Sequence, residues 1–535
     1  MTWLPARELW KNWCFGLFLG GLMIAFQLTA MLIMLIKTPP GMIWMGNLVL
    51  NAVDYPVYLN YLEQGAHSLW LTNLYNNFPQ VLRFDAFWSL GGFLVRLGLS
   101  AIQAHEILRW LGTMVLGLVV YGTAKHVTTD EHRARVSSLI ILNGMSLGWL
   151  HAIIANLSTG KMLISIPPDV SSELSIAPLL TGGAHAILSL SLQLLLIRWV
   201  WLIVARDQKK YLYPAVPLAA FFAAFHPYFI PLMSLVALIA LTLQIKKSRL
   251  AQRAVSAGTI LSSMLPAGLY FLWLAGQDKN FSHHFLVVNQ LNLHRPTFWL
   301  FSLLPILIAG YFLYWSKKIS LDQYRTTNLQ WVWIWIATAL ICLSLPFPWS
   351  AKYTQGLMPA FSLLTLPFWL WLYDKYLAGH GLGSMRLMLA VLYIGAPFLY
   401  VMFMHVQVSN SEVRPLFYQP KNVALGLEMI KQATDSDAVL LVDDPDLALW
   451  IPAKTLRRVW LGHEHETPDY PGRSRQLERW RATDNTNDFN DFLNINIISI
   501  LISNQPANTS RYSSLLKDNW SEIYKNNDLT VWQRN

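Results

Sequence analysis

Repeated apolar runs long enough to cross a lipid bilayer constrain the fold of this chain more than any other feature. A hydrocarbon core about 30 Å thick requires about 20 apolar residues in a helix. Runs of about this length lie at 14–36, 106–124, 136–156, 183–205, 254–275, 297–315, 329–346, 357–374 and 386–404. The stretch 211–245 is also apolar, but FHPYF interrupts it and predicts two short helices that meet at Pro227. We therefore expect an α-helical polytopic membrane protein with about eleven transmembrane helices.

The composition indicates the same class of protein. Of the 535 residues, 54% are hydrophobic and 13% are charged, whereas a water-soluble domain carries about 25% charged residues. Many of the 24 tryptophans lie near the ends of apolar runs, where amphipathic rings prefer the head-group level. The two cysteines, Cys14 and Cys342, fall inside apolar runs, so we expect no disulfide bonds. The first run has a basic flank and no small-residue cleavage site, which predicts a retained first span.

The distribution of Lys and Arg predicts the orientation in the membrane. These residues cluster in alternate loops, near 7–11, 125–135, 206–210, 246–253, 317–325 and 375–386. Because basic loops stay on the cytoplasmic side, we expect the N-terminus there and a first outward loop over 38–105. These loops also account for much of the net charge of +10, and we expect no nucleic-acid partner. The run 86–100 would reverse every later loop if it crossed the membrane, so we interpret it as a helix in the outer interface.

After residue 405 the sequence becomes polar, and helical and strand-like segments alternate. AVLLVD, TLRRVWLG and NIISILIS indicate strands, and NVALGLEMIKQA and SRQLERWRA indicate helices. Such alternation predicts a small α/β domain. We therefore expect a transmembrane module over 1–404, which includes the first outward loop, and an extracytoplasmic α/β domain over 405–535.

Ionisable side chains in the outward loops are candidates for chemistry, because charge at membrane level is costly and marks function. They are Asp54 in VDYPVY, Asp169 and Glu173 in PPDVSSELS, His226 in FHPYF and Lys352 in PFPWSAKYTQG. If these groups converge, they could act as a general base, hold a metal ion or neutralise one another. The alternatives are a solvated carboxylate, a histidine that satisfies backbone groups at a helix break, and a lysine that extends to the head groups. The tyrosines and tryptophans of the first outward loop are more typical of interface anchors than of sugar-binding platforms.

The segment GHEHETPD, residues 462–469, looks like a cluster of metal ligands because His463 and His465 alternate with acids. A spacing of two residues fits a strand or a loop and does not fit a zinc-binding helix. We therefore favour a structural role for this segment.

Several motifs occur together in a recognisable order. DYPVYLNYLEQG and LWLTNLY lie in the first outward loop, PPDVSSE follows in the next, and FHPYF, PFPWSAKYTQGLMPAFSLL and RRVWLGHEHETPD come later. Over most of the chain, this order resembles the GT-C superfamily of membrane glycosyltransferases, in particular its large bacterial members. The first outward loop lacks a plain Asp-x-Asp and the tail lacks a WWDYG-like motif, in contrast to the metal-dependent oligosaccharyltransferases. A peptide-asparagine acceptor is therefore not expected.

The resemblance implies an inverting glycosyltransferase that moves a sugar from a polyprenyl-phosphate donor to an acceptor at the outer face of the membrane. Asp54 matches the acid of the family's first outward loop and would be the general base that takes the acceptor proton. Lys352 and His226 would bind the donor phosphate, which gathers negative charge in the transition state. Asp169 and Glu173 would orient the acceptor or hold a metal.

The remaining expectations concern substrates and partners. The tyrosines expected to line the substrate are Tyr55, Tyr58 and Tyr228. The presence of a Mg²⁺ or Mn²⁺ ion is left undecided, since carboxylates alone do not indicate a bound metal ion. The expected partners are a lipid-linked sugar, a glycan, lipid or protein acceptor, and the lipids of a bacterial inner membrane. A secondary transporter or lipid flippase with polar groups at broken helices, and a non-catalytic membrane scaffold, are the alternatives.

Overall fold

The computed structural model describes most of the protein. The described residues are 6–78, 81–128, 130–159, 174–245, 249–278, 281–282, 296–315, 329–345, 349–377, 384–409, 414–482, 485–516 and 519–535. Contacts within the chain define two compact units. The helical unit comprises Met1–Ala30, Leu108–Phe271 and Asn289–Gln407, and the loop–tail unit comprises Met31–Ile107, Leu272–Val288 and Val408–Asn535. The first outward loop is thus grouped with the C-terminal segment, whereas the sequence analysis grouped it with the transmembrane helices. The predicted domain boundary between residues 404 and 405 stays a prediction.

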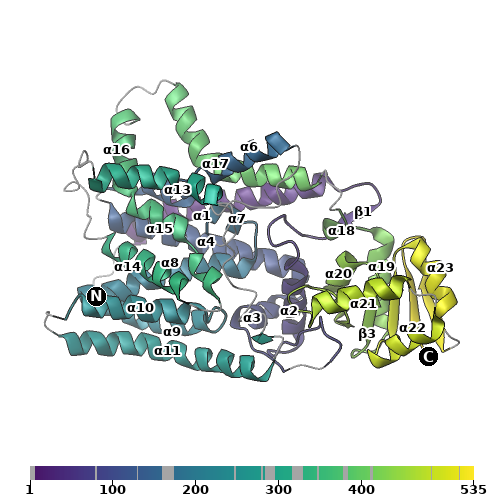
Figure 1. Ribbon diagram of the computed structural model, residues 1–535. Coiled ribbons are helices and arrows are strands. Elements are labelled where there is room, and N and C mark those ends of the chain that lie inside the picture. Colours follow the sequence, from purple (N-terminus) through teal and green to yellow (C-terminus); the bar gives the residue numbers. More distant parts are fainter. Residues whose placement is uncertain are drawn as a thin grey trace. The chain divides into compact units, whose positions relative to one another are not determined.

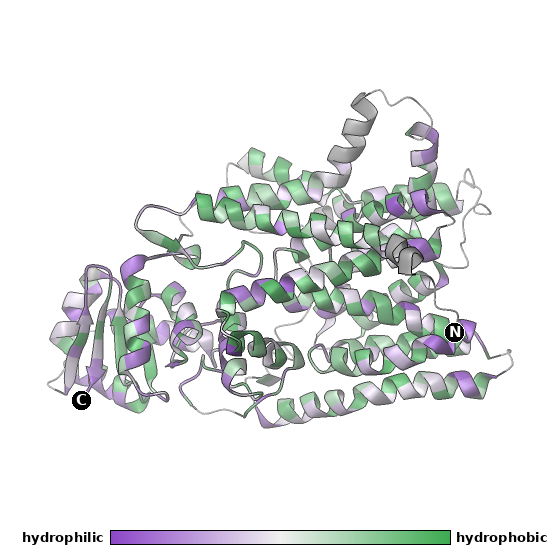
Figure 2. Cartoon of the chain, turned by 180° about the vertical axis from the view of Figure 1, so that it is seen from behind, coloured by the Kyte–Doolittle hydropathy of each residue, from purple (hydrophilic) through white to green (hydrophobic). Residues whose placement is uncertain are grey.

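The apolar runs of the sequence form helices. These are α1 (Ala6–Ile36), α4 (Ala101–Val127), α5 (Glu131–Asn143), α6 (Gly148–Thr159), α7 (Ile176–Leu179), α8 (Ala184–Arg206), α9 (Leu212–Ala223), α10 (Phe229–Thr242), α11 (Leu250–Gln277), α13 (Pro296–Gly310), α14 (Gln330–Ser344), α15 (Leu357–Leu364), α16 (Leu366–Tyr376) and α17 (Ser384–Ser409). In the helical unit, α8 packs against α9 and α10, and α10 packs against α14 (Figure 1). The long helices are coloured largely as hydrophobic in Figure 2. The fold is therefore a predominantly α-helical membrane protein, as expected.

Five helical segments among the described residues are long and apolar enough to cross a membrane, and a sixth is formed if the bent pair of α15 and α16 counts as one span. α8 lies mostly inside the protein, whereas α1 and α11 expose most of their apolar surface. Exposed apolar helix faces are stable in lipid, because every backbone polar group is satisfied within the helix. The expected number of about eleven spans stays a prediction.

The apolar stretch 211–245 is broken as predicted. α9 ends at Ala223 and α10 begins at Phe229, so the FHPYF segment forms the turn between two short helices. The ring of Pro227 lacks an N–H, and proline disfavours the helical conformation of the residue before it. His226 therefore lies at the helix break.

The first outward loop contains two packed helices, α2 (Tyr55–His67) and α3 (Ala86–Arg96). They approach closely through two glycines, because a Cβ placed on Gly92 would lie 2.2 Å from the carbonyl carbon of Gly65. α3 has 11 residues, which is about 16 Å and too short to cross a bilayer. Leu90 and Phe93 are exposed on its surface. α3 alone is therefore too short for a span, and its location in the outer interface stays a prediction.

The C-terminal segment forms an α/β domain, as predicted. Its strands are β3 (Val439–Val442), β4 (Arg458–Val459), β5 (Ile500–Ser503), β6 (Trp520–Lys525) and β7 (Thr530–Arg534), arranged in the order β4-β3-β5-β7-β6. Its helices are α18 (Arg414–Phe417), α19 (Lys421–Ala433), α20 (Pro445–Thr455), α21 (Tyr470–Ala482), α22 (Thr486–Ile495) and α23 (Pro506–Leu515). β3 pairs with β4 and β5 in parallel, and the remaining pairs are antiparallel. The segment TLRRVWLG contributes only two residues of strand, and the sequence did not predict α20, α22 or β6.

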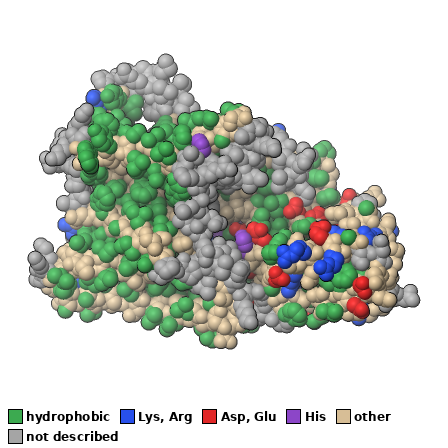
Figure 3. Space-filling model, viewed as in Figure 1, with side chains coloured by type: hydrophobic (Ala, Val, Ile, Leu, Met, Phe, Trp, Pro, Cys, Tyr) green, Lys and Arg blue, Asp and Glu red, His purple; other side chains and the backbone are tan. Residues whose placement is uncertain are grey.

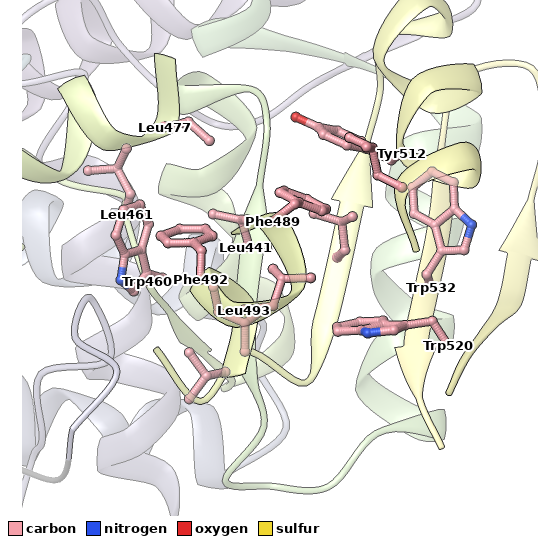
Figure 4. Close-up of a cluster of buried hydrophobic side chains, with 14 residues drawn as sticks. Leu441, Trp460, Leu461, Leu477, Phe489, Phe492, Leu493, Tyr512, Trp520 and Trp532 are labelled. Carbon is pink, nitrogen blue, oxygen red and sulfur yellow. The ribbon is translucent and has the colours of Figure 1, made fainter. Parts of the chain in front are cut away.

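Aromatic side chains fill the core on one face of this sheet (Figure 4). Alternate strand residues, including Leu441 and Leu501, point toward this face. Phe489 of α22 stacks on Tyr512 of α23, with ring centroids 5.6 Å apart. Charged side chains lie on the surface of the domain, and hydrophobic side chains cover much of the helical unit (Figure 3). The domain therefore has a core of its own.

A short strand pair links the first outward loop to the C-terminal domain within the loop–tail unit. β1 (Met42–Trp44) pairs antiparallel with β2 (Tyr418–Pro420). Helices α2 and α20 also pack against each other. Segments more than 370 residues apart in the sequence are thereby held together, as the hydrogen bond from the Tyr75 hydroxyl to the carbonyl of Leu449 illustrates.

Candidate active site

Asp54 occupies the position just before α2. The preceding turn includes Asn51 at a φ of 58°, and the N–H of Tyr55 donates to the carbonyl of Asn51. Pro56 lies in the first turn of the helix, where its missing N–H has no cost. The Asp54 side chain makes no capping hydrogen bond to the backbone of α2. Its carboxylate is therefore available for contacts other than a helix cap.

His463 of the C-terminal domain lies against that carboxylate. Its Nε2 is 3.0 Å from Oδ1 of Asp54, and the hydroxyl of Tyr58 lies 3.5 Å from Oδ2. The N–H of His465 donates to Nδ1 of His463 at 3.2 Å. In the neutral ring, Nδ1 is therefore the acceptor, and Nε2 carries the proton that is donated to Asp54.

The two members of this pair differ in their exposure to solvent. The side chain of His463 is 2% exposed, whereas that of Asp54 is 38% exposed. Burial lowers the pKa of His463, but the hydrogen bond and charge of Asp54, together with Glu466 and Glu464, outweigh burial and raise the pKa above its usual value. A buried histidine thus holds one oxygen of a carboxylate that remains accessible.

The loop around His463 is fixed by the first outward loop. The N–H of Val459 donates to the carbonyl of Leu74 at 2.8 Å, directly after β4 begins. Gly462 lies against Tyr75, and a Cβ at this glycine would approach the ring to 2.7 Å. The ring of Tyr75 in turn lies edge-on to His463, with centroids 6.0 Å apart. Close packing at Gly462 therefore helps to set the position of the histidine.

A second acidic group in the same loop is held by α2. The hydroxyl of Tyr61 donates to Oε1 of Glu466 at 3.2 Å, and the side-chain amide of Asn73 donates to the Glu466 carbonyl at 2.7 Å. The guanidinium of Arg83 lies over the ring of Tyr61, 4.3 Å from its centroid. Burial opposes the charge on Arg83, but Tyr61 and Glu466 raise its pKa, so the guanidinium stays charged. Arg83 adds a fixed positive charge to the acidic loop.

An aromatic layer packs next to Asp54. The rings of Tyr58 and Trp88 are stacked with centroids 4.8 Å apart, and Tyr58 is also parallel to His105 at 6.2 Å. Tyr55 is 5% exposed and lies edge-on to His105 and Trp450. Tyr58 thus contacts the candidate carboxylate directly, whereas the ring of Tyr55 packs against His105 and Trp450. A substrate-lining role for either tyrosine stays a prediction.

The predicted phosphate-binding residues gather in the helical unit. The ammonium of Lys352 lies 6.0 Å from the ring centroid of Tyr228, which is 6.1 Å from the ring of His226. His226 is buried and stacks with His185 at 5.6 Å. Lys352 belongs to a short 3₁₀ helix, Ser350–Thr354. The structure therefore brings three predicted residues into one cluster, although they come from segments more than 120 positions apart in the sequence.

Asp169 and Glu173 lie outside the described residues, so their predicted role stays a prediction. Within the described parts of the chain, no group of three or more His, Cys, Asp or Glu side chains is arranged to hold a metal ion. His463 and His465, which resembled metal ligands in the sequence, instead contact carboxylates, with His465 3.2 Å from Glu464.

The sequence did not identify His463, Glu466 or Arg83 as partners of the candidate site. The alternation of histidine and acid in GHEHETPD was a visible signal, but no spacing rule connects this segment to Asp54. Arg83 carried no signal of its own, because a single arginine in a polar loop is usually solvated.

Comparison with known proteins adds a likeness of fold. No protein-family model matches the chain, and no curated protein matches it significantly. The structure is similar to that of ArnT from Cupriavidus metallidurans bound to undecaprenyl phosphate, with a TM-score of 0.47 and 14% identity over 96% of this chain and 98% of that one.

Two further structures are similar at this level. One is the archaeal oligosaccharyltransferase AglB from Archaeoglobus fulgidus in complex with an inhibitory peptide and a dolichol-phosphate, with a TM-score of 0.43 and 13% identity over 92% of this chain and 70% of that one. The other is the arabinofuranosyltransferase AftD from Mycobacteria, with a TM-score of 0.45 and 12% identity over 96% of this chain and 41% of that one. Membership of the GT-C superfamily stays a prediction from the sequence motifs.

Proposed function

We propose that this protein is an inverting glycosyltransferase that moves a sugar from a polyprenyl-phosphate-linked donor to an acceptor at the outer face of the membrane. Asp54 is the general base, and His463 is the residue that positions it. The observation that carries the proposal is the 3.0 Å contact between a buried histidine and one oxygen of a partly exposed carboxylate.

The two oxygens of Asp54 have different tasks in this mechanism. Oδ1 accepts the hydrogen bond from His463, which fixes the orientation of the carboxylate, and Oδ2 faces the hydroxyl of Tyr58. An acceptor hydroxyl that displaces Tyr58 would transfer its proton to Oδ2 as its oxygen attacks the anomeric carbon. The bond from that carbon to the donor phosphate breaks on the opposite side, which inverts the configuration.

The leaving phosphate requires a positive charge that is already in place. Lys352, next to Tyr228 and His226, is proposed to supply this charge. Because negative charge grows on the phosphate as the glycosidic bond breaks, the lysine stabilises the transition state more than the bound donor.

The test is sugar transfer by the purified protein in lipid nanodiscs, with a panel of polyprenyl-phosphate sugars and extracts containing acceptors. Asp54→Asn should lower the transfer rate by about 10²–10⁴-fold, the usual contribution of a general base. Glu63→Gln is the matched control, because it removes a carboxylate from α2, nine residues after Asp54. Equal rates for Asp54→Asn and the wild type, with Glu63→Gln also active, would exclude Asp54 as the base.

A further inference from the structure

A hollow of about 360 Å³ lies in the loop–tail unit, apart from the Asp54 pair. Its walls are mainly apolar. Ile43 and Met45 come from the β1 segment, and Leu425 and Leu427 come from α19. Leu425 is 64% exposed, which leaves a large apolar side chain at the rim. The hollow therefore offers apolar surface that no described part of the chain covers.

The position of the hollow in the chain places it near the membrane boundary. α1, a candidate span, ends at Ile36 with that side chain 71% exposed, and β1 begins six residues later at Met42. Six residues reach at most about 20 Å. The pairing strand β2 contacts the same helix, because the hydroxyl of Tyr418 donates to the carbonyl of Met34 at 2.8 Å. The wall of the hollow thus begins shortly after the end of a candidate membrane span.

Two lysines line this otherwise apolar hollow. Lys421 is the first residue of α19, and Lys454 comes from the last turn of α20. Among the described residues, no hydrogen bond or ion pair engages the ammonium of Lys454. Burial lowers the pKa of Lys454, and the charges of Glu428 and Glu63 oppose this effect. Glu428 also lines the hollow, so the lining carries two positive charges and one negative charge.

We propose that this hollow binds the head group of a membrane phospholipid, with the phosphate between Lys421 and Lys454 and the start of an acyl chain on Leu425 and Ile43. The lipid would fasten the β1 and β2 segments to the bilayer surface. This role depends on membrane insertion and not on the proposed sugar transfer.

The phosphate can come from an anionic or a zwitterionic lipid, or from solution, and the experiment separates these sources. The full-length protein is purified in detergent and exposed to phosphatidylglycerol, phosphatidylethanolamine or inorganic phosphate, and the bound lipid is counted by native mass spectrometry. We expect retention of one or both phospholipids, and about 30-fold weaker binding in Lys421→Gln/Lys454→Gln, since each lysine contributes about 1 kcal/mol near a lipid surface.

Lys525→Gln is the matched control, because Lys525 is exposed on β6 and pairs with Glu522. It should bind lipid like the wild type. Equal retention of phospholipid by the double variant and by the control would overturn the proposal. Displacement of the phospholipid by millimolar inorganic phosphate, with no preference of the protein for the lipid over the free ion, would also overturn it. Leu425→Asp serves as a second variant on the apolar wall, and unchanged binding in this variant would also contradict the proposal. Thermal unfolding in detergent shows whether each variant is folded.

Discussion

Replacement of His463 tests whether the histidine orients Asp54. His463→Ala removes the donor that contacts Oδ1 at 3.0 Å and weakens the constraint on the orientation of the carboxylate. Misplacement of a catalytic group by about 1 Å can lower the rate about 10²-fold. We therefore expect kcat to fall by about 10–100-fold, with the donor KM unchanged because His463 does not contact the donor phosphate in the proposed mechanism.

The effect on stability should be small by comparison. A hydrogen bond to a charged group contributes about 1.5–3 kcal/mol. The Asp54 side chain is 38% exposed, so water can replace the lost donor, and we expect a loss of about 1 kcal/mol. His463→Gln keeps an N–H donor at similar reach and should restore most of the rate. The control is His465→Ala, because it removes a side chain that pairs with Glu464 and keeps the backbone N–H that donates to His463.

The pH dependence gives an independent readout. The pKa of His463 is raised in the folded protein, so the pair with Asp54 stabilises the fold fully below the ordinary histidine pKa of 6.5. This contribution is lost as the pH rises through the raised pKa. Thermal unfolding measured from pH 6.5 to 9, above the range in which stability depends on Asp85, should show the loss in the wild type and not in His463→Gln. An unchanged kcat in His463→Ala, or a slope that persists in His463→Gln, would refute the role assigned to His463.

Three further substitutions test other parts of the structure. Gly92→Ala should unfold the α2–α3 pair or lower the free energy of unfolding by at least about 1–3 kcal/mol, because its Cβ would overlap the backbone of Gly65. Gly258→Ala is the control and should have little effect in thermal unfolding, because the space around this glycine is open. Asp85 accepts hydrogen bonds from two N–H groups of α3. Asp85→Ala should therefore lower the free energy of unfolding by about 1 kcal/mol, and Asp85→Asn should lower it little. Equal losses of stability in the two variants would contradict the capping role. Burial raises the pKa of Asp85 to about 6, although the cap bonds and Arg83 oppose the shift; stability should therefore fall as the pH rises from about 4 to 6, and Asp85→Asn should remove this dependence. Lys352→Ala should lower kcat and the kcat/KM for the donor by about 10-fold or more in a transfer assay and leave the acceptor KM unchanged, because a charged hydrogen bond contributes about 1.5–3 kcal/mol. An effect on the acceptor KM alone would reject the phosphate role.

Local sequence patterns were sufficient for much of the fold. The run 183–205 forms α8 almost at its predicted bounds, because apolar composition and helical periodicity act within one segment. FHPYF breaks its helical stretch for the local reason that proline lacks an N–H. The short strand β4 was harder to predict, because its pairing with β3 is made by distant residues. The helix α22 was missed, although Asn485 caps it with two hydrogen bonds.

The sequence by itself determined that the chain is a helical membrane protein with an α/β tail, and it singled out Asp54 as an acid in a region poor in charge. Only the tertiary structure decided what that acid contacts. Asp54 and His463 are 409 residues apart, and they meet because α2 packs on α20 and β1 pairs with β2. Hydrophobic periodicity specifies which face of an element is buried, but it carries no information about which distant element covers that face.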